Sequence, residues 1–231
     1  MKLDLFDAYN IRVRLSSSII LLAPIAITIF LCFGEIASFA SSSVIAVILL
    51  AFTNYIPIIQ RRLCQNRSFT VNYAARFLAA NDKTIDAVTK KRYYRTLAGI
   101  DSSFDLFNTP TDSEAFQKCC NSAVLYLRNH TRENALVQEE NINYGLCRNL
   151  FATKKIGIIL CIVLCISIAL VSWVKHDSFS SIPEQYLFSF VADFLFLLFW
   201  IFGVTRKTLE STAMQYARTL LSTIDSIETL K

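Results

Sequence analysis

The stretch VADFLFLLFWIFGV, residues 191–204, has the composition of a lipid-facing helix at every position except Asp193. Leucine, isoleucine and phenylalanine favour hydrocarbon, whereas a charged residue at the centre of a membrane helix costs about 2.5–3.5 kcal/mol on insertion scales. An aspartate in such a run needs a bonding partner, water or a function. The same apolar density recurs along the chain, and it decides the fold class.

The apolar residues of this 231-residue chain are concentrated in four blocks. Residues 15–33, 44–59 and 156–174 carry no charge, and residues 187–204 carry only Asp193. A helix that crosses the hydrocarbon core needs about 17–25 apolar residues, and the second block reaches that length once Ser41–Ser43 are included. We therefore predict an all-α integral membrane protein with transmembrane helices at 15–33, 41–59, 156–174 and 187–204.

A cleaved signal peptide is the alternative for the first block, because GEIASFASSS offers small residues resembling a cleavage site. The preceding segment carries Asp4 and Asp7, and the apolar block is longer than a typical signal-peptide core. A retained membrane anchor is the better interpretation.

The basic residues lie on one side of the predicted helices. Lys2, Arg12 and Arg14 precede the first helix, and Arg206 and Lys207 follow the fourth. Residues 61–155 carry fifteen Lys and Arg against nine Asp and Glu. By the positive-inside rule we expect a multi-pass protein of the inner membrane with both termini in the cytoplasm.

This orientation divides the chain into two membrane hairpins and three cytoplasmic parts. In order, we predict a cytoplasmic N-terminal segment (1–14), transmembrane hairpin 1 (15–60), a cytoplasmic helical domain (61–155), transmembrane hairpin 2 (156–204) and a cytoplasmic amphipathic helix (205–231). In that last helix an apolar stripe runs from Leu209 through Tyr216 and Leu220 to Ile227, which indicates a face that packs on a partner.

The cytoplasmic domain has helical periodicity throughout. One helix is expected around residues 69–80, a second from Thr84 to Gly99, and a third that begins at the capping box Thr111–Glu114. Without Pro or Gly before Gly145, the third is expected to run on through the membrane or to break near Gly145.

The sequence lacks the motifs of common enzymes and metal sites. The chain has two His, no Gly-rich phosphate loop and no hydrolase or zinc-protease motif, and the adjacent Glu139 and Glu140 point apart on a helix. Cys119, Cys120 and His130 lack the spacing of a zinc site. We expect no enzyme activity, no metal and no cofactor.

Asp193 has three interpretations: a bond to a hydroxyl such as Thr28 or Ser172, a shallow position in wetted headgroups, or a place along a water-filled path. In the first helix the polar groups share one face, which suits tight packing and equally a pore wall. We favour the pore slightly, because packing does not require the acid at the outer end of this face. The predicted pore-lining residues are Ser17, Thr28, Glu35 and Asp193.

One four-helix chain is too small to enclose a channel, so a conducting path requires a ring of subunits. We expect a homo-oligomer, with a tetramer favoured, in which Glu35 or Asp193 repeats around the axis. Such an acidic collar favours cations.

The segment KKRYYR interleaves cations with aromatic rings, and it lies beyond the zone that lipid headgroups explain. Cations suit phosphate and tyrosine rings suit bases, so the segment is a candidate site for an anionic nucleotide or oligonucleotide. A solvated charged face is the ordinary alternative. The candidate residues are Lys90, Lys91, Arg92, Tyr93, Tyr94 and Arg95.

The order of hairpin, basic helical block, hairpin and tail, with RTLAGIDSSFDLFNTPTDSE at residues 95–114, resembles the small four-transmembrane effectors of bacterial anti-phage nucleotide-signalling systems. These include the SMODS-associated four-transmembrane type and the Hailong membrane effector. The resemblance implies an oligomeric channel that a nucleotide second messenger gates and that depolarises the host membrane during infection. It implies as partners the nucleotide or the nucleotidyltransferase that makes it.

Two other functions compete with the channel. A non-conducting scaffold would use its cytoplasmic helices to recruit a soluble partner. A proton-coupled transporter would use Asp193 as the carrier, although visible repeats and broken helices are lacking.

Overall fold

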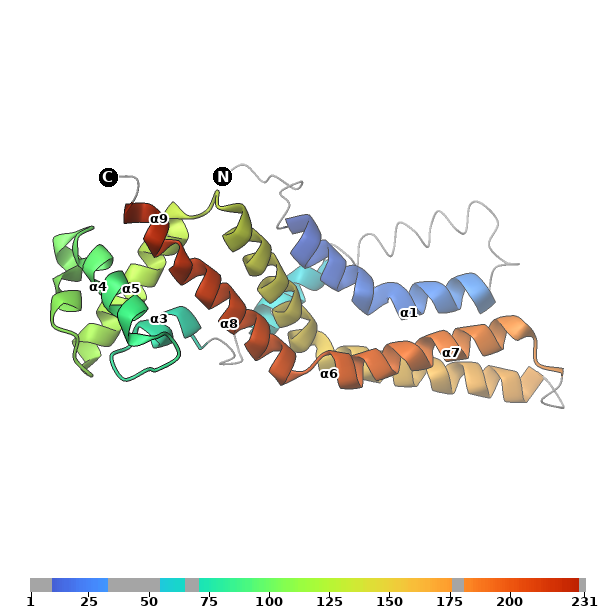
Figure 1. The fold of residues 1–231 in the computed structure, drawn as a ribbon. Helices are drawn as coiled ribbons and strands as arrows, with labels where there is room; N and C mark the ends of the chain where they lie inside the picture. Colours follow the sequence, from blue (N-terminus) through green and yellow to red (C-terminus); the bar gives the residue numbers. More distant parts are fainter. Residues whose placement is uncertain (1–9, 33–54, 65–70, 176–180, 229–231) are drawn as a thin grey trace. The chain divides into compact units, whose positions relative to one another are not determined.

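In a computed structural model of the chain, the described residues are 10–32, 55–64, 71–175 and 181–228, and every regular element in these ranges is a helix. The predicted all-α class is therefore confirmed for the described part of the chain. Figure 1 shows the helices in sequence colours.

Three helices are long and apolar enough to cross a membrane, at Arg12–Cys32, Ala135–Lys175 and Glu184–Gly203. They contain or closely match the predicted spans 15–33, 156–174 and 187–204, which indicates a membrane-associated protein. The predicted span 41–59 lies mostly outside the described residues, as does Glu35; of that region, residues 55–64 are helical.

The chain divides into two compact units. Unit 1 comprises residues 1–67 and 145–209, and unit 2 comprises residues 68–144 and 210–231. Two helices, α6 (Ala135–Lys175) and α8 (Arg206–Ser222), contribute residues to both units.

Unit 1 contains the apolar helices. The π-helical turn η1 (Asn10–Leu15) leads into α1 (Ser16–Cys32), and α7 (Glu184–Leu198) leads into a second π-helical turn, η4 (Phe199–Gly203). Helix α1 packs against α7. A small core collects Leu21, Ile56, Leu150, Cys161, Trp200 and Val204.

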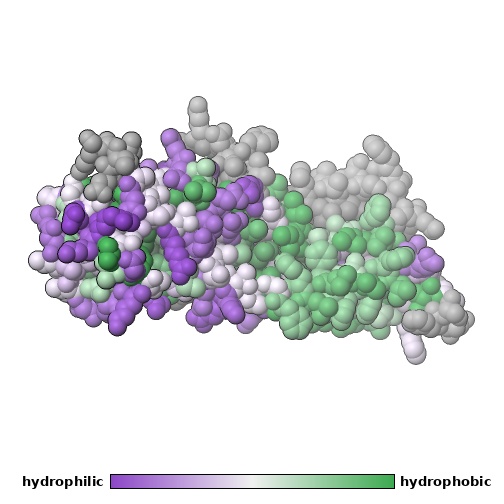
Figure 2. Space-filling view, in the orientation of Figure 1, coloured by the Kyte–Doolittle hydropathy of each residue, from purple (hydrophilic) through white to green (hydrophobic). Residues whose placement is uncertain are grey.

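The outward faces of these helices are strongly apolar, as the green surface in Figure 2 shows. Ile159, Ile166 and Leu170 of α6 and Phe188 and Leu195 of α7 are each more than half exposed. Soluble proteins rarely leave such continuous apolar surface in water, whereas lipid accommodates it.

The contact between α6 and η4 depends on a residue without a side chain. A Cβ added at Gly157 would overlap the indole ring of Trp200, which is fully buried. Glycine therefore lets the helix backbone approach the largest side chain of the unit 1 core.

Unit 2 is built around an aromatic core. Its helices are α3 (Tyr73–Leu78), α4 (Ala87–Ala98), the 3₁₀ helix η2 (Ser102–Asn108), α5 (Glu114–His130), the start of α6, most of α8, and α9 (Ile224–Glu228). Tyr94 contacts Phe107 at a centroid distance of 5.3 Å and Phe116 edge-on at 5.8 Å. These rings join α4, η2 and α5.

The C-terminal helix packs as its sequence pattern predicts. Tyr216, Leu220 and Ile224 are buried in the unit 2 core, and the Tyr216 ring stacks on Tyr144 with centroids 6.0 Å apart. The apolar stripe of this helix therefore packs on other helices of the same chain.

The prediction of one helix from Thr111 into the membrane is wrong, and so is the alternative break near Gly145. Helix α5 ends at His130 and α6 begins at Ala135, and α6 continues through Gly145 without interruption. The Thr131 hydroxyl donates to the Leu127 carbonyl, and the Asn134 side chain accepts from the backbone N–H groups of Leu136 and Val137. Polar side chains thus end one helix and start the next without Gly or Pro.

The predicted capping box is displaced by two residues. The N-cap of α5 is Ser113, whose hydroxyl accepts from the Phe116 N–H at 3.2 Å, while the Thr111 hydroxyl lies 2.9 Å from that of Ser113. The helix begins at Glu114, close to the expected place.

Gly157→Ala is expected to destabilise unit 1 by about 1–3 kcal/mol, the usual range for overpacking a core, because the new methyl group and Trp200 cannot share one space. The measurement is thermal loss of the monodisperse size-exclusion peak in detergent. Gly99→Ala is the control, because a Cβ there meets nothing closer than 3.6 Å. If Gly157→Ala melts like the wild type, or if adding Trp200→Leu fails to restore its stability, the contact does not hold α6 to η4.

Candidate functional site

Asp193 lies at a three-residue polar cluster between α1 and α7. The Thr28 hydroxyl donates to Asp193 Oδ2 at 2.8 Å, and the Ser189 hydroxyl donates to Thr28 Oγ1 at 3.1 Å. Ser189 and Asp193 are four positions apart on α7, so they face the same side, and Thr28 reaches them from α1. Ser189 and Asp193 are 0% exposed and Thr28 is 8% exposed.

The second oxygen of this carboxylate has no hydrogen-bond partner within the described residues. Asp193 Oδ1 is buried and unbonded, in a setting where buried polar groups are nearly always paired. Leaving such an atom unpaired costs about 1–3 kcal/mol or more for a charged group. Among the described residues, this carboxylate is therefore held across the α1–α7 contact through one of its two oxygens, by Thr28.

A second polar contact ties the start of α1 to the helical residues 55–64. The Ser17 hydroxyl lies 3.0 Å from Gln60 Oε1 and 3.0 Å from the Arg14 carbonyl, and both Ser17 and Gln60 are buried. Among the described residues, Gln60 Nε2 has no acceptor.

The structure therefore shows the contact interpretation of Asp193, with Thr28 as the partner. Ser17, Thr28 and Asp193, predicted to line a pore, are all buried against other helices of the same chain. The polar face of α1, including Leu21 and Pro24, packs on protein and is not a wall open to water in the single chain. The Thr28 hydroxyl thus finds its acceptor on a neighbouring helix, as polar side chains of packed membrane helices do.

Lys154 stabilises the C-terminal end of the second hairpin. Its ammonium donates to the carbonyls of Ile201 at 3.0 Å and Val204 at 2.7 Å, which belong to the last turn before α8. A cation at this helix end satisfies carbonyls that lack helical partners and interacts favourably with the helix dipole.

The segment KKRYYR forms part of α4, and its six residues divide between the core and the surface. Lys90 is 7% exposed and donates to the carbonyls of Ala79 at 2.7 Å and Asp82 at 2.5 Å. Burial lowers the pKa of the Lys90 ammonium, and the Asp82 carboxylate partly offsets this. Lys90 thus holds the turn after α3.

The two tyrosines are core residues. Tyr93 and Tyr94 are 6% and 8% exposed, and the Tyr94 hydroxyl donates to the Leu78 carbonyl at 2.6 Å. Burial raises the pKa of both phenols. The interpretation of these rings as stacking surfaces for bases does not hold, because their faces pack on other side chains.

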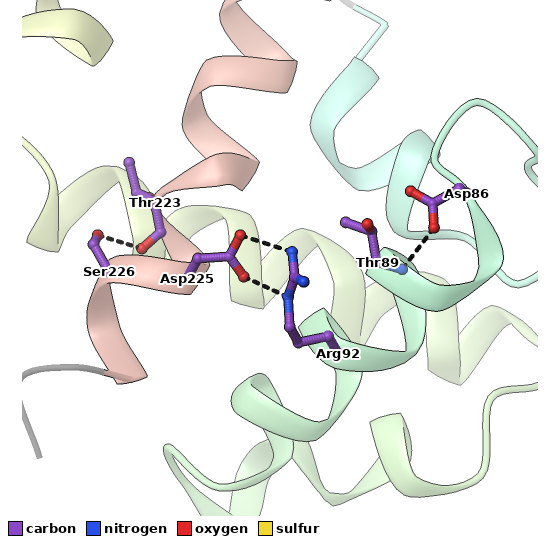
Figure 3. Close-up of polar contacts among 6 residues, drawn as sticks. All are labelled: Asp86, Thr89, Arg92, Thr223, Asp225 and Ser226. Atoms are coloured by element: carbon purple, nitrogen blue, oxygen red, sulfur yellow. Dashed lines mark hydrogen bonds and ion pairs between the residues drawn. The ribbon is translucent and has the colours of Figure 1, made fainter.

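The remaining three cations lie on the surface. Lys91 and Arg95 are exposed and make no hydrogen bond or ion pair with other described residues, whereas Arg92 pairs with Asp225 through two bonds. Figure 3 shows this pair.

Lys91 and Arg95 border a hollow between α4 and η2. Its volume is about 430 Å³. The lining residues are Ala87, Lys90, Lys91, Tyr94, Arg95, Phe107, Asn108 and Pro110. The hollow thus combines two exposed cations with an amide and an apolar floor, which suits an anion that carries a less polar group.

Helix α5 carries two adjacent buried thiols, Cys119 and Cys120. Cys120 is 0% exposed, and burial raises its pKa to about 12, so it stays a protonated thiol. Burial also raises the pKa of Cys119. Within the described ranges, no cluster of His, Cys, Asp and Glu is arranged to hold a metal ion.

Comparison with family models, curated proteins and solved structures gives no match for this chain. The resemblance to anti-phage effectors thus has no support beyond the sequence features that indicate it.

Sequence reasoning missed the other half of this hollow. Phe107, Asn108 and Pro110 lie in the connector after Gly99, which shows no helical period in the sequence but folds as η2. Two phenylalanines, Phe104 and Phe107, in a polar connector were the available signal, since both are buried. The sequence gives no indication that Asp225 pairs with Arg92, because this pair forms only when α9 packs on α4.

Adjacent lysines on α4 are expected to behave differently. Lys90→Ala removes the side-chain donor to the Asp82 carbonyl and leaves the Ala79 carbonyl with the Asp82 N–H, so it is expected to lower the free energy of unfolding by about 1–3 kcal/mol. Lys91→Ala, at the exposed neighbouring position, is expected to change it by less than about 0.5 kcal/mol. Urea unfolding in detergent, followed by far-UV circular dichroism, measures both values. Equal effects of the two substitutions would contradict the assignment of Lys90 to the core.

Proposed function

We propose that the protein is an oligomeric membrane channel whose helical unit 2 senses an anionic nucleotide, in the defence role that the resemblance implies. The observation that carries the proposal is Asp193, which is buried in an apolar helix and, among the described residues, bonded through one of its two oxygens. The proposal places unit 2 in the cytoplasm and the three apolar helices, with the predicted span 41–59, in the inner membrane.

The α1–α7 contact provides the two states that gating requires. In the closed state Thr28 holds Asp193, as in the described structure. In the open state the contact parts and Asp193 enters water on the shared axis of several subunits, where both of its oxygens are solvated. Ligand binding must favour the open state over the closed one, because equal affinity for both shifts nothing.

The ligand site of the proposal is the hollow between α4 and η2. Lys91 and Arg95 supply positive charge for phosphate, and Asn108 supplies an amide for a polar edge of the ligand. Helices α6 and α8 contain residues of both units, so they are the covalent routes by which binding reaches the apolar helices.

The non-conducting scaffold remains the second candidate, and a specific observation favours it. Ser17, Thr28 and Asp193 are satisfied or covered by the chain itself, as in a stable anchor. The two functions differ in oligomer size, because a channel needs a ring of chains and an anchor does not.

Thr28→Val is expected to raise basal ion flux through reconstituted liposomes about 10- to 100-fold, because it removes a bond to a charged group worth about 1.5–3 kcal/mol in the closed state. Asp193→Asn keeps the shape and is expected to reduce the preference for cations. The measurement is fluorescent-dye flux under a potassium gradient.

Ser167→Ala is the matched control, because the Ser167 hydroxyl bonds only to the Val163 carbonyl of its own helix at 2.7 Å among described contacts. Unchanged flux and selectivity in both test variants would contradict a path past Asp193. A single-copy protein without flux would favour the scaffold.

The charge-reversed variant Lys91→Glu/Arg95→Glu is expected to weaken binding of a fluorescent 5′-phosphorylated trinucleotide by at least about tenfold, since two cation–phosphate contacts become repulsive. Anisotropy in detergent measures the affinity. Lys118→Glu/Arg132→Glu, at two exposed positions away from the hollow, changes the net charge by the same amount and is the control. A loss of binding to phosphatidylglycerol vesicles, with trinucleotide affinity unchanged, would assign the site to lipid headgroups instead.

A further inference from the structure

The surface of α4 carries three cations within five positions, and within the described residues a carboxylate engages just one of them. Lys91 and Arg95 are four positions apart and Arg92 and Arg95 three, so each pair is adjacent on the helix surface. Lys91 and Arg95 border the hollow, and Arg92 extends the positive row beyond it. An anion with one phosphate engages the first two cations, and a longer polyanion reaches the third.

Asp225 binds the third cation, Arg92, in the two-bond geometry with which a phosphate also binds arginine. Arg92 Nε donates to Asp225 Oδ1 at 2.8 Å, and Arg92 Nη2 donates to Oδ2 at 3.0 Å. Figure 3 shows this parallel pair of bonds between α4 and α9. Guanidinium binds carboxylate and phosphate oxygens by the same fork, so the two anions compete for one site.

The segment that presents Asp225 is short and lightly held. Helix α9 has five residues, Ile224–Glu228, and follows a break at Thr223. The break is closed by local bonds: the Thr223 hydroxyl donates to Leu220 O and the Ser226 hydroxyl to Thr223 O, each at 2.7 Å. Because the Arg92 and Asp225 side chains are 49% and 42% exposed, solvent weakens the pair and a ligand can displace it.

We propose that Asp225 is an internal competitor of the ligand, and that the site selects anions with two or more spaced phosphates. Such a ligand binds Lys91 and Arg95 with one phosphate and replaces Asp225 on Arg92 with another. This inference rests on the proposed nucleotide site and adds to it a ligand class, short oligonucleotides over mononucleotides.

Displacement of Asp225 has a structural consequence within unit 2. Helix α9 loses its salt bridge to α4, while Ile224, which is 0% exposed, stays buried in the unit 2 core. Helix α8, which ends one residue before α9, follows the second apolar hairpin in the chain. Release of α9 thus acts on the end of the helix that connects the ligand site to that hairpin.

The test uses the full-length protein in detergent, with a labelled 5′-phosphorylated trinucleotide and the corresponding mononucleotide. Asp225→Asn removes the competing charge and is expected to bind the trinucleotide about two- to fivefold more tightly, the range set by an exposed ion pair, with mononucleotide affinity unchanged. Adding Arg92→Gln is expected to abolish the gain. Hydrogen exchange of residues 220–228 is expected to rise in the wild type when trinucleotide is added, and to be raised in Asp225→Asn without it.

Asp86→Asn is the matched control. Asp86 is also exposed near Arg92, and it caps α4 by accepting from the Thr89 N–H at 2.8 Å, a role that asparagine fills equally well. It removes the same charge without touching the Arg92–Asp225 pair. An equal gain in Asp86→Asn, or tighter mononucleotide binding in Asp225→Asn, would overturn the competition in favour of a general charge effect.

The two proposals fail in different ways. If neither wild type nor Asp225→Asn binds either nucleotide, the nucleotide site itself is wrong. If both bind the trinucleotide with the same affinity and the exchange of residues 220–228 does not change, the site stands and the role of Asp225 is refuted.

Discussion

A carboxylate removed from water must be held by donors from the protein, and among the described residues the donor to Asp193 is one hydroxyl from another helix. Thr28 supplies the bond and Ser189 orients Thr28, so three side chains fix how α1 meets α7. The residues around this cluster are mostly apolar and offer few directional bonds. The Thr28–Asp193 hydrogen bond is directional, so this cluster helps to specify how α1 packs on α7 in an otherwise apolar interface.

The same constraint operates in unit 2 with the opposite charge. The Lys90 ammonium is buried and held by two backbone carbonyls at the end of α3, and the Tyr94 hydroxyl bonds the Leu78 carbonyl nearby. Polar atoms of α4 therefore satisfy the turn that a short helix leaves open. The Tyr94 ring packs on Phe107 and Phe116, so the residue that makes one of these bonds also belongs to the aromatic core.

Within each unit, the charged groups differ in how completely they are satisfied. Lys154 and Lys90 are each held by two carbonyls, whereas Asp193 has one bonded oxygen in the part of the chain that the structure describes. On the surface of α4, Arg92 has a carboxylate partner and its neighbours Lys91 and Arg95 have none among the described residues. Functional sites often contain charged groups whose bonding is incomplete. The proposed gate lies at Asp193, and the proposed ligand site lies at Lys91 and Arg95.

Hydropathy and periodicity determined much of the fold. Apolar blocks predicted the helices that contain 15–33, 156–174 and 187–204, and spacing predicted the buried stripe of the C-terminal helix, because both properties depend on residues close in sequence. The break between α5 and α6 was not predicted, because the sequence there has no Gly or Pro. The hydroxyl of Thr131 and the amide of Asn134 end one helix and start the next instead.

Only the tertiary structure decided which polar residues are structural. Lys90 and Lys91 are neighbours in sequence, but successive helical positions point in directions about 100° apart, so packing buries one and exposes the other. Likewise, the sequence allowed Thr28 and Asp193 to face water or each other, and they meet at 2.8 Å because α1 packs on α7. The sequence shows which buried polar groups need hydrogen-bond partners. It does not show which partners they have, because these lie far away in the chain and are brought close only by tertiary packing.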